Sequence, residues 1–271
     1  MYSGTTFRNK SGRLIGAHQK IDRVARRVLE SLAPGSDFPS IKEILHFEGK
    51  NGPDGIKSKS PAQDEPWHYF DPSDSRHQKL FQIIERHSKN LQSALKKGEG
   101  EKAAFEAAWF AHALVDGLTP AHHYPLGEKL EELRGEGIET RTSTLDKLVV
   151  RGQDDRLTQM LVKNWEVWGA RGIMTTHGLY EWGVATIAAP LRLHSARPTP
   201  ADCRAVLKVG ILELFIEAAN GIYQLKMYER FQEKGWTRQL ARETRDYLVP
   251  LIVKIVILGW YEALSKAQRS K

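Results

Sequence analysis

The chain has 271 residues, of which 41% are hydrophobic and 27% are charged, and its formal net charge is +7. This composition fits a soluble globular protein with a sizeable core and excludes an intrinsically disordered chain. The single cysteine, Cys203, excludes an intramolecular disulfide and a site built from several cysteine ligands. The positive charge permits a polyanionic or anionic-surface partner but does not require one.

Apolar residues recur with the period of an α-helix through most of the chain. One stripe covers about 14–32 and a second covers about 80–95, and glycine follows each of them. Strand patterns are nearly absent. The sequence therefore predicts an all-α fold, a multi-helix bundle around one core that forms a single domain over residues 1–271. The further helices are expected at about 101–117, 126–135, 140–151, 155–169, 174–189, 201–234 and 237–267.

The segment 34–66, between the first two helices, is rich in proline and glycine and is expected to be a long non-helical loop. A loop of this length in a compact helical protein is usually functional or disordered. The apolar run Leu248–Tyr261 contains Pro250 and Lys254, so a core helix is the favoured interpretation and a reversible membrane contact is the alternative. The first residues contain no apolar signal-peptide core, which favours a cytoplasmic location.

A group of metal-ligating residue types lies around residue 116. His112 and Asp116 are four residues apart on a predicted helix, so their side chains can converge on one point. Pro120 would end that helix and let His122 turn toward the same place. The neighbouring His123 is a rival to His122. The alternative interpretation, a helix end with polar caps and one core histidine, is less favoured because a buried His and Asp both need partners.

Two other segments carry the same residue types. His177 and Glu181 are again four residues apart, a spacing at which imidazole and carboxylate can chelate one zinc-type ion. His68 lies among aromatic residues, which suggests a partly buried imidazole. Asp54 follows proline and precedes glycine, so local sequence alone favours a turn residue there. His18, at the start of the first helix, indicates nothing by itself.

These residues together resemble the zinc-dependent phospholipase C and P1/S1 nuclease superfamily. The pattern His112-x3-Asp116-x3-Pro120-x-His122 is similar to the family's His-x3-Asp-x3-Pro-x-His core. His177-x3-Glu181 resembles its final His-x3-acid pair, and the glutamate is closer to the bacterial phospholipase C branch than to the nuclease branch. The resemblance extends from about residue 16 to residue 185.

The resemblance implies two or three zinc ions and an all-α phosphodiesterase. Clustered cations would hold the oxygens of a phosphodiester and lower the pKa of a bound water, which attacks phosphorus. Asp54 and Asp116 are the carboxylates implied in catalysis, Asp54 as a ligand that also accepts a proton. The implied ligands are Asp54, His68, His112 and Asp116 for one ion, His122, His177 and Glu181 for a second, and His18 with the bridging Asp116 for a third.

The chain also departs from that family. The family's third ion takes the amino group and carbonyl of an N-terminal Trp, whereas this chain begins with Met1 and Tyr2. The third site could use these residues differently or be empty. The segment between His122 and His177 is long and is expected to form a helical excursion near the site. His46, His77, His87 and His194 lack such support and are interpreted as surface or capping residues.

The substrate is less defined than the chemistry. Gly55 and Glu65 stand where choline-selective relatives resemble one another in having aromatic residues, so a choline pocket is not indicated. Tyr69 could stack a base, as in the nuclease branch. The first hypothesis is a phospholipase C-type hydrolase of a phospholipid or related phosphate diester, with possible peripheral membrane contact. The alternatives are a single-strand-preferring nuclease acting on nucleic acid and a non-catalytic metal-binding helical module.

Overall fold

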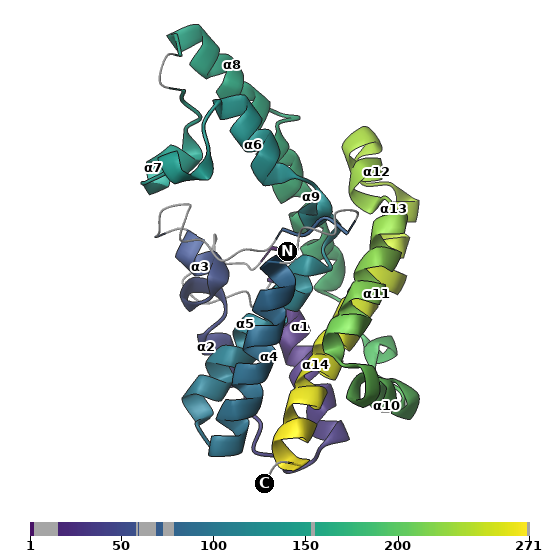
Figure 1. The fold of residues 1–271 in the computed structure, drawn as a ribbon. Coiled ribbons are helices and arrows are strands. Elements are labelled where there is room, and N and C mark those ends of the chain that lie inside the picture. The colour runs from purple at the N-terminus through teal and green to yellow at the C-terminus, as the bar shows by residue number, and fades with distance from the viewer. Residues whose placement is uncertain (3–15, 58, 60–68, 73–78, 153–154, 270–271) are drawn as a thin grey trace.

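The computed structural model describes the chain except residues 3–15, 58, 60–68, 73–78, 153–154 and 270–271. The described residues form helices and connecting turns and contain no strand, which confirms the all-α prediction (Figure 1). The helices of the first half are α1 (Ala17–Leu32), α2 (Ile41–His46), α3 (Pro53–Lys57), α4 (Lys79–Lys97), α5 (Gly100–Gly117), α6 (Leu126–Arg134) and α7 (Thr144–Leu148). Those of the second half are α8 (Leu157–Trp168), α9 (Ile173–Ala188), α10 (Pro200–Val209), α11 (Ile211–Gln224), α12 (Met227–Lys234), α13 (Arg238–Glu243) and α14 (Val249–Arg269).

The core is built around α14, which packs against α1, α4, α5, α10 and α11. Helix α5 is rich in buried alanines, so neighbouring helices can approach it closely. At this contact Gly259 of α14 faces the Phe110 ring, and Trp260 donates its indole N–H to the carbonyl of Ala107 at 3.1 Å. By length and composition, Arg238–Arg269 is a candidate membrane span within the described residues, but 72% of its most apolar window is buried inside the protein. The core-helix interpretation of the apolar run 248–261 is thus the one that the packing supports.

The predicted secondary structure of three segments was wrong. The loop 34–66 contains the short helices α2 and α3 in its described part. The expected helix 201–234 is divided into α10, α11 and α12, because the chain takes positive φ angles at Gly210 (+90°) and Lys226 (+49°). The expected helix 140–151 is only the five-residue α7, which starts at a capping box formed by Ser143 and Asp146.

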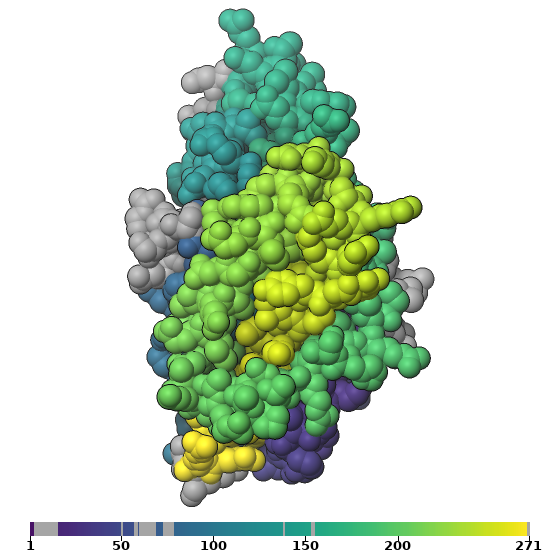
Figure 2. All heavy atoms as spheres, turned by 90° about the vertical axis from the view of Figure 1, so that its right-hand side faces the viewer, coloured from purple at the N-terminus to yellow at the C-terminus, as the bar shows by residue number. Residues whose placement is uncertain are grey.

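An excursion of α6, α7 and α8 leaves the bundle after the 3₁₀ turn Pro120–His123 and returns through α9. The excursion extends from the upper end of the molecule in Figure 1. Figure 2 shows it again with α11 and α12 turned toward the viewer. The sequence predicted a helical excursion between His122 and His177, and the structure places it there. The polar cluster described next lies where this excursion joins the bundle.

Candidate metal centre

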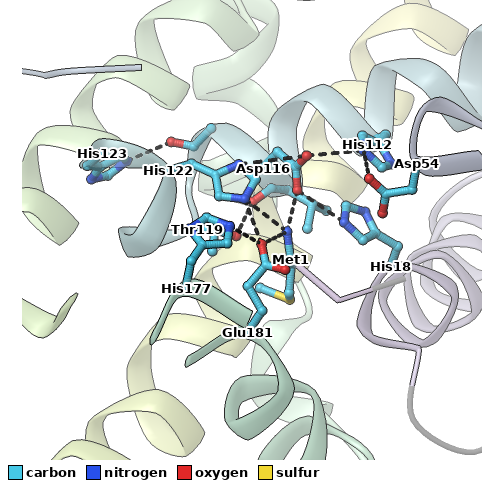
Figure 3. A network of polar contacts seen from close by, with 12 residues as sticks. Met1, His18, Asp54, His112, Asp116, Thr119, His122, His123, His177 and Glu181 are labelled. Atoms are coloured by element: carbon cyan, nitrogen blue, oxygen red, sulfur yellow. Dashed lines mark hydrogen bonds and ion pairs between the residues drawn. The ribbon is translucent and has the colours of Figure 1, made fainter. Parts of the chain in front are cut away.

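Asp116 lies at the centre of a buried cluster of histidines and carboxylates (Figure 3). It occupies the last turn of α5, and its side chain is only 1% exposed. Its Oδ1 atom lies 3.1 Å from His18 Nε2, and its Oδ2 atom lies 3.1 Å from His112 Nε2 and 3.7 Å from His122 Nδ1. One carboxylate thus faces histidines from three separate segments of the chain, which is the arrangement expected of a bridging ligand.

The first half of the cluster joins α1, α3 and α5. His18 stacks on His112 with 4.1 Å between ring centroids and 11° between ring planes. Asp54, in the first turn of α3, places Oδ1 3.8 Å from His112 Nε2. Asp54, His112 and Asp116 therefore form one potential metal-binding group, and these are three of the residues that the family resemblance implied as ligands of one ion.

The second half of the cluster is formed by His122, His177 and Glu181. The helix α5 ends at Gly117, and the 3₁₀ turn that begins at Pro120 carries His122 back toward Asp116. Glu181 Oε1 lies 2.7 Å from His122 Nε2 and 3.2 Å from His177 Nε2, and the two imidazoles stack at 5.2 Å. This is a second potential metal-binding group next to the first.

The amino group of Met1 lies between the two halves (Figure 3). Its nitrogen is 2.5 Å from Asp116 Oδ1, 3.1 Å from Glu181 Oε1 and 3.5 Å from His122 Nε2. Burial lowers the pKa of this amine, but the negative charges of Asp116 and Glu181 outweigh burial and raise it. A positive charge is therefore held at the point where the ligand atoms converge.

Several nitrogen atoms of the cluster lack a hydrogen bond, and their distances to neighbouring ligand atoms suit coordination of a metal ion. Asp116 oxygens lie 3.1 Å from His18 Nε2 and His112 Nε2, but neither contact has the geometry of a hydrogen bond. Within the described residues, His18 Nδ1 and His177 Nδ1 are also buried without a hydrogen bond. Unsatisfied buried polar atoms are rare in native proteins. Ligand atoms around a tetrahedral zinc ion lie about 3.3 Å apart. The separations around His112 and His177, 3.1 to 3.8 Å, match that spacing.

The electrostatics of the first half depend on carboxylates. Burial disfavours the charged form of His112, but Asp116, Glu48 and Asp54 raise the pKa of His112 well above its usual range. These carboxylates therefore favour the protonated form of the His112 ring when no cation is bound. A cation would replace that proton and satisfy the same negative charges.

In the second half, nearby positive charge keeps the carboxyls ionised, and burial keeps the His122 imidazole neutral. Burial opposes the charge of Asp116 and Glu181, but the Met1 amine and the surrounding histidines hold the pKa of both carboxyls well below the usual range. Burial lowers the pKa of His122 to about 4, although Asp116 acts against this change. His122 is therefore a neutral imidazole at neutral pH, which is the form that binds a metal.

Glu48 belongs to the site and was missed by the sequence analysis. It is 2% exposed, and its Oε1 lies 3.1 Å from His112 Nδ1, on the ring edge away from Asp116. It also forms a potential metal-binding group with His18 and His112. Nothing in the local sequence marks this residue, because its position depends on the short turn Gly49–Asn51 that precedes α3.

The other histidines have different outcomes. His123 points away from the cluster and contacts the carbonyl of Gly117 at 2.8 Å, so of the two rivals it is His122 that joins the site. His46 and His194 are exposed, as predicted. His87 was wrongly interpreted as a surface or capping residue: it is buried and contacts Glu106 at 2.6 Å. The predicted ligand His68, and His77 with it, lie outside the described residues.

Tyr69 lines the second half of the cluster. Its ring centroid is 5.4 Å from that of His122 and 6.3 Å from that of His177. The neighbouring Phe70 donates its backbone N–H to the carbonyl of His122 at 3.0 Å, which fixes this segment beside the site. The cluster therefore has an aromatic wall.

Comparison of the chain with protein-family models, with curated proteins and with solved structures finds no match.

Proposed function

We propose that the protein is a zinc-dependent phosphodiester hydrolase of phospholipase C type. The observation that carries the proposal is the convergence of five described histidines and carboxylates around Glu181 and the buried Asp116. Such a mixed set of imidazole and carboxylate donors suits zinc, and donors that bridge two groups suit a cluster of ions rather than one. The five residues are His18, Asp54, His112, His122 and His177.

In this proposal Asp116 bridges, and the two groups hold one ion each. His18 and the second oxygen of Asp116 would hold a third, beside the Met1 amino group. Zinc ions bound there would supply Lewis acidity to the phosphate oxygens and lower the pKa of water toward about 7. His68 is proposed as a further ligand of the first ion on the resemblance alone.

Proton transfer from the attacking water is assigned to one of the carboxylates that reach solvent. The side chains of Asp54 and Glu181 are each 16% exposed, whereas that of Asp116 is 1% exposed. The site therefore meets solvent at Asp54 and Glu181. We assign Asp54 the acceptance of a proton from the attacking water, because it combines contact with the cluster and access to solvent. Asp116 then serves to position the histidines.

A phospholipid or related diester is the proposed substrate, and a single-stranded nucleic acid is the second candidate. Tyr69 favours the second candidate, because a ring beside two ligand histidines could stack a base. Assays on phospholipid vesicles and on single-stranded DNA and RNA rank the two substrates. The non-catalytic alternative predicts bound metal without hydrolysis of any diester.

The direct test combines metal analysis with Asp116→Asn. The unchanged protein is expected to bind two or three zinc ions per chain and to cleave a chromogenic phosphodiester. Asp116→Asn should lose most of both properties and keep its helical circular dichroism spectrum. Asp246→Asn, at an exposed residue paired with Arg245, is the matched control and should change neither. A protein that binds no zinc would overturn the proposal.

A further inference from the structure

Helix α8 is packed with its apolar stripe toward solvent. Leu157, Leu161 and Trp165, spaced four residues apart on one side of the helix, are 73%, 63% and 71% exposed. The polar residues Lys163 and Asn164 face inward instead. Lys163 Nζ lies 2.8 Å from Asp155 Oδ1. The side-chain amide of Asn164 accepts a hydrogen bond from the backbone N–H of Val150 and donates one to its carbonyl. An amphipathic helix in this orientation leaves its apolar face without a partner within the described chain.

The exposed apolar side chains are concentrated in one part of the molecule. Ten of the twelve large hydrophobic residues that are exposed in the described chain lie between 145 and 182. Large exposed apolar patches on soluble proteins mark interaction sites. We call the stripe on α8 the outer face of α8; its members are Leu157, Leu161, Val162, Trp165 and Trp168.

Basic side chains border this face. Arg156 immediately precedes α8, Arg171 follows it, and both are exposed. Among the described acids near this face, Asp155 is paired with Lys163 and Glu132 of α6 with Lys129, and Glu166 is the exposed acid of α8 itself. The face is therefore apolar in the middle and basic at both ends. This is the charge pattern of a helix that lies at a membrane surface, where tryptophan sits at the headgroup level and arginine meets anionic lipid.

The excursion that carries this face begins and ends next to residues of the metal centre. His122 lies four residues before the start of α6, and His177 lies on α9, which packs against α8. Leu179 and Trp182, two residues before and one residue after Glu181 on α9, are 46% and 48% exposed. We propose that the outer face of α8, with Arg156 and Arg171 at its ends, docks the protein on an anionic phospholipid bilayer.

The choice of a bilayer as the partner rests in part on the proposed phospholipid hydrolysis, so the experiment measures binding without hydrolysis. The protein is mixed, in the presence of EDTA, with phosphatidylcholine vesicles that contain or lack phosphatidylserine, and bound protein is recovered by flotation. We expect stronger binding to the vesicles with phosphatidylserine. The double variant Leu161→Ser, Trp165→Ser should bind them at least about tenfold more weakly, because both side chains lose burial in the bilayer.

The matched control is Val209→Ser, Tyr247→Ser, which removes two exposed apolar residues away from the excursion. It should bind as the unchanged protein does. Arg156→Gln with Arg171→Gln should remove the preference for phosphatidylserine and leave binding to pure phosphatidylcholine unchanged. Circular dichroism of each variant confirms that it is folded.

Two outcomes overturn the proposal. One is equal vesicle binding by the unchanged protein and the Leu161/Trp165 double variant, or no binding by either. The other is a dimer in size-exclusion chromatography that the double variant converts to a monomer, with no vesicle binding, which would make the face an interface between copies of the chain. Failure of the hydrolase proposal gives a different result, namely vesicle binding intact and no cleavage when zinc is restored.

Discussion

Glu48 faces the side of the His112 imidazole that the rest of the cluster leaves uncovered. Its Oε1 lies 3.1 Å from Nδ1, whereas Nε2 of the same ring lies 3.1 Å from Asp116. Metal-ligating histidines commonly donate their second N–H to a carboxylate, which fixes the tautomer and orients the ring. Glu48 is therefore well placed as a positioning residue rather than as a ligand.

Glu48→Gln is expected to lower zinc affinity about 10–100-fold while the protein stays folded, because the ring loses its charged acceptor. Isothermal titration calorimetry measures the affinity. The control is Glu106→Gln, which changes the buried partner of His87 outside the cluster and should leave zinc affinity unchanged. Equal zinc affinity of Glu48→Gln and the unchanged protein would remove the positioning role.

His177→Ala should lower the number of bound zinc ions by one and leave the ion of the other group in place. The reason is geometric: the contacts of His177 are with Glu181 and His122, whereas His112 and Asp54 form a separate group. Native mass spectrometry of the zinc-loaded protein counts the ions. His194→Ala, at an exposed histidine, is the control. Loss of all ions in His177→Ala would mean that the two groups bind metal as one unit.

The helical pattern and the local His-x3-acid pairs could be predicted from the sequence because both depend on neighbours in one helix. His112 with Asp116, and His177 with Glu181, needed only the helical period. That these pairs meet across the fold depends on the turn at Pro120, which the sequence also marked. In the part of the chain that the structure describes, these pairs lie together in groups that could hold a metal ion.

What the sequence could not predict depends on contacts between distant segments. Glu48 reaches His112 across 64 positions, and no spacing rule applies to such a pair. The buried His87 was misassigned for the same reason, since its partner Glu106 lies on the next helix. The direction of the outer face of α8 is likewise a tertiary property, because its apolar residues would suit a core equally well.

Gly52 is needed for the backbone approach that sets Glu48 and Asp54 in place. A Cβ atom at Gly52 would lie 2.7 Å from the carbonyl oxygen of Phe47 and 2.9 Å from the Cα of Glu48, so the backbone would have to move. Gly52→Ala is expected to lower the free energy of unfolding by about 1–3 kcal/mol and to weaken zinc binding. Gly100→Ala is the control, because a Cβ there would meet no atom within 4 Å.

Denaturant unfolding of the metal-free protein measures the first effect, and zinc titration measures the second. If Gly52→Ala weakened zinc binding without a loss of stability, the backbone strain would be absorbed by the ligand segment alone. If neither the free energy of unfolding nor the zinc affinity changed, the close backbone contact at Gly52 would not contribute to stability or to zinc binding.

Zinc binding is expected to release protons at neutral pH, and His112 is their expected source. Its pKa is raised well above the usual range by Asp116, Glu48 and Asp54 despite burial, so the metal-free ring is protonated and must become neutral to bind zinc. His122, with a pKa lowered to about 4, and the ionised Asp116 and Glu181 have no proton to release. Zinc affinity should therefore rise as the pH increases, until the pH exceeds the pKa of His112.

Calorimetric titrations in buffers of different ionisation enthalpy measure the number of protons released, which should be about one or more per chain. Glu48→Gln removes one of the negative charges that raise the pKa of His112, so it should reduce both the proton release and the pH dependence of affinity. A binding heat that is independent of the buffer in the unchanged protein would contradict this account. It would mean that His112 carries no proton to exchange for the metal, and hence that the carboxylates do not keep this ring protonated.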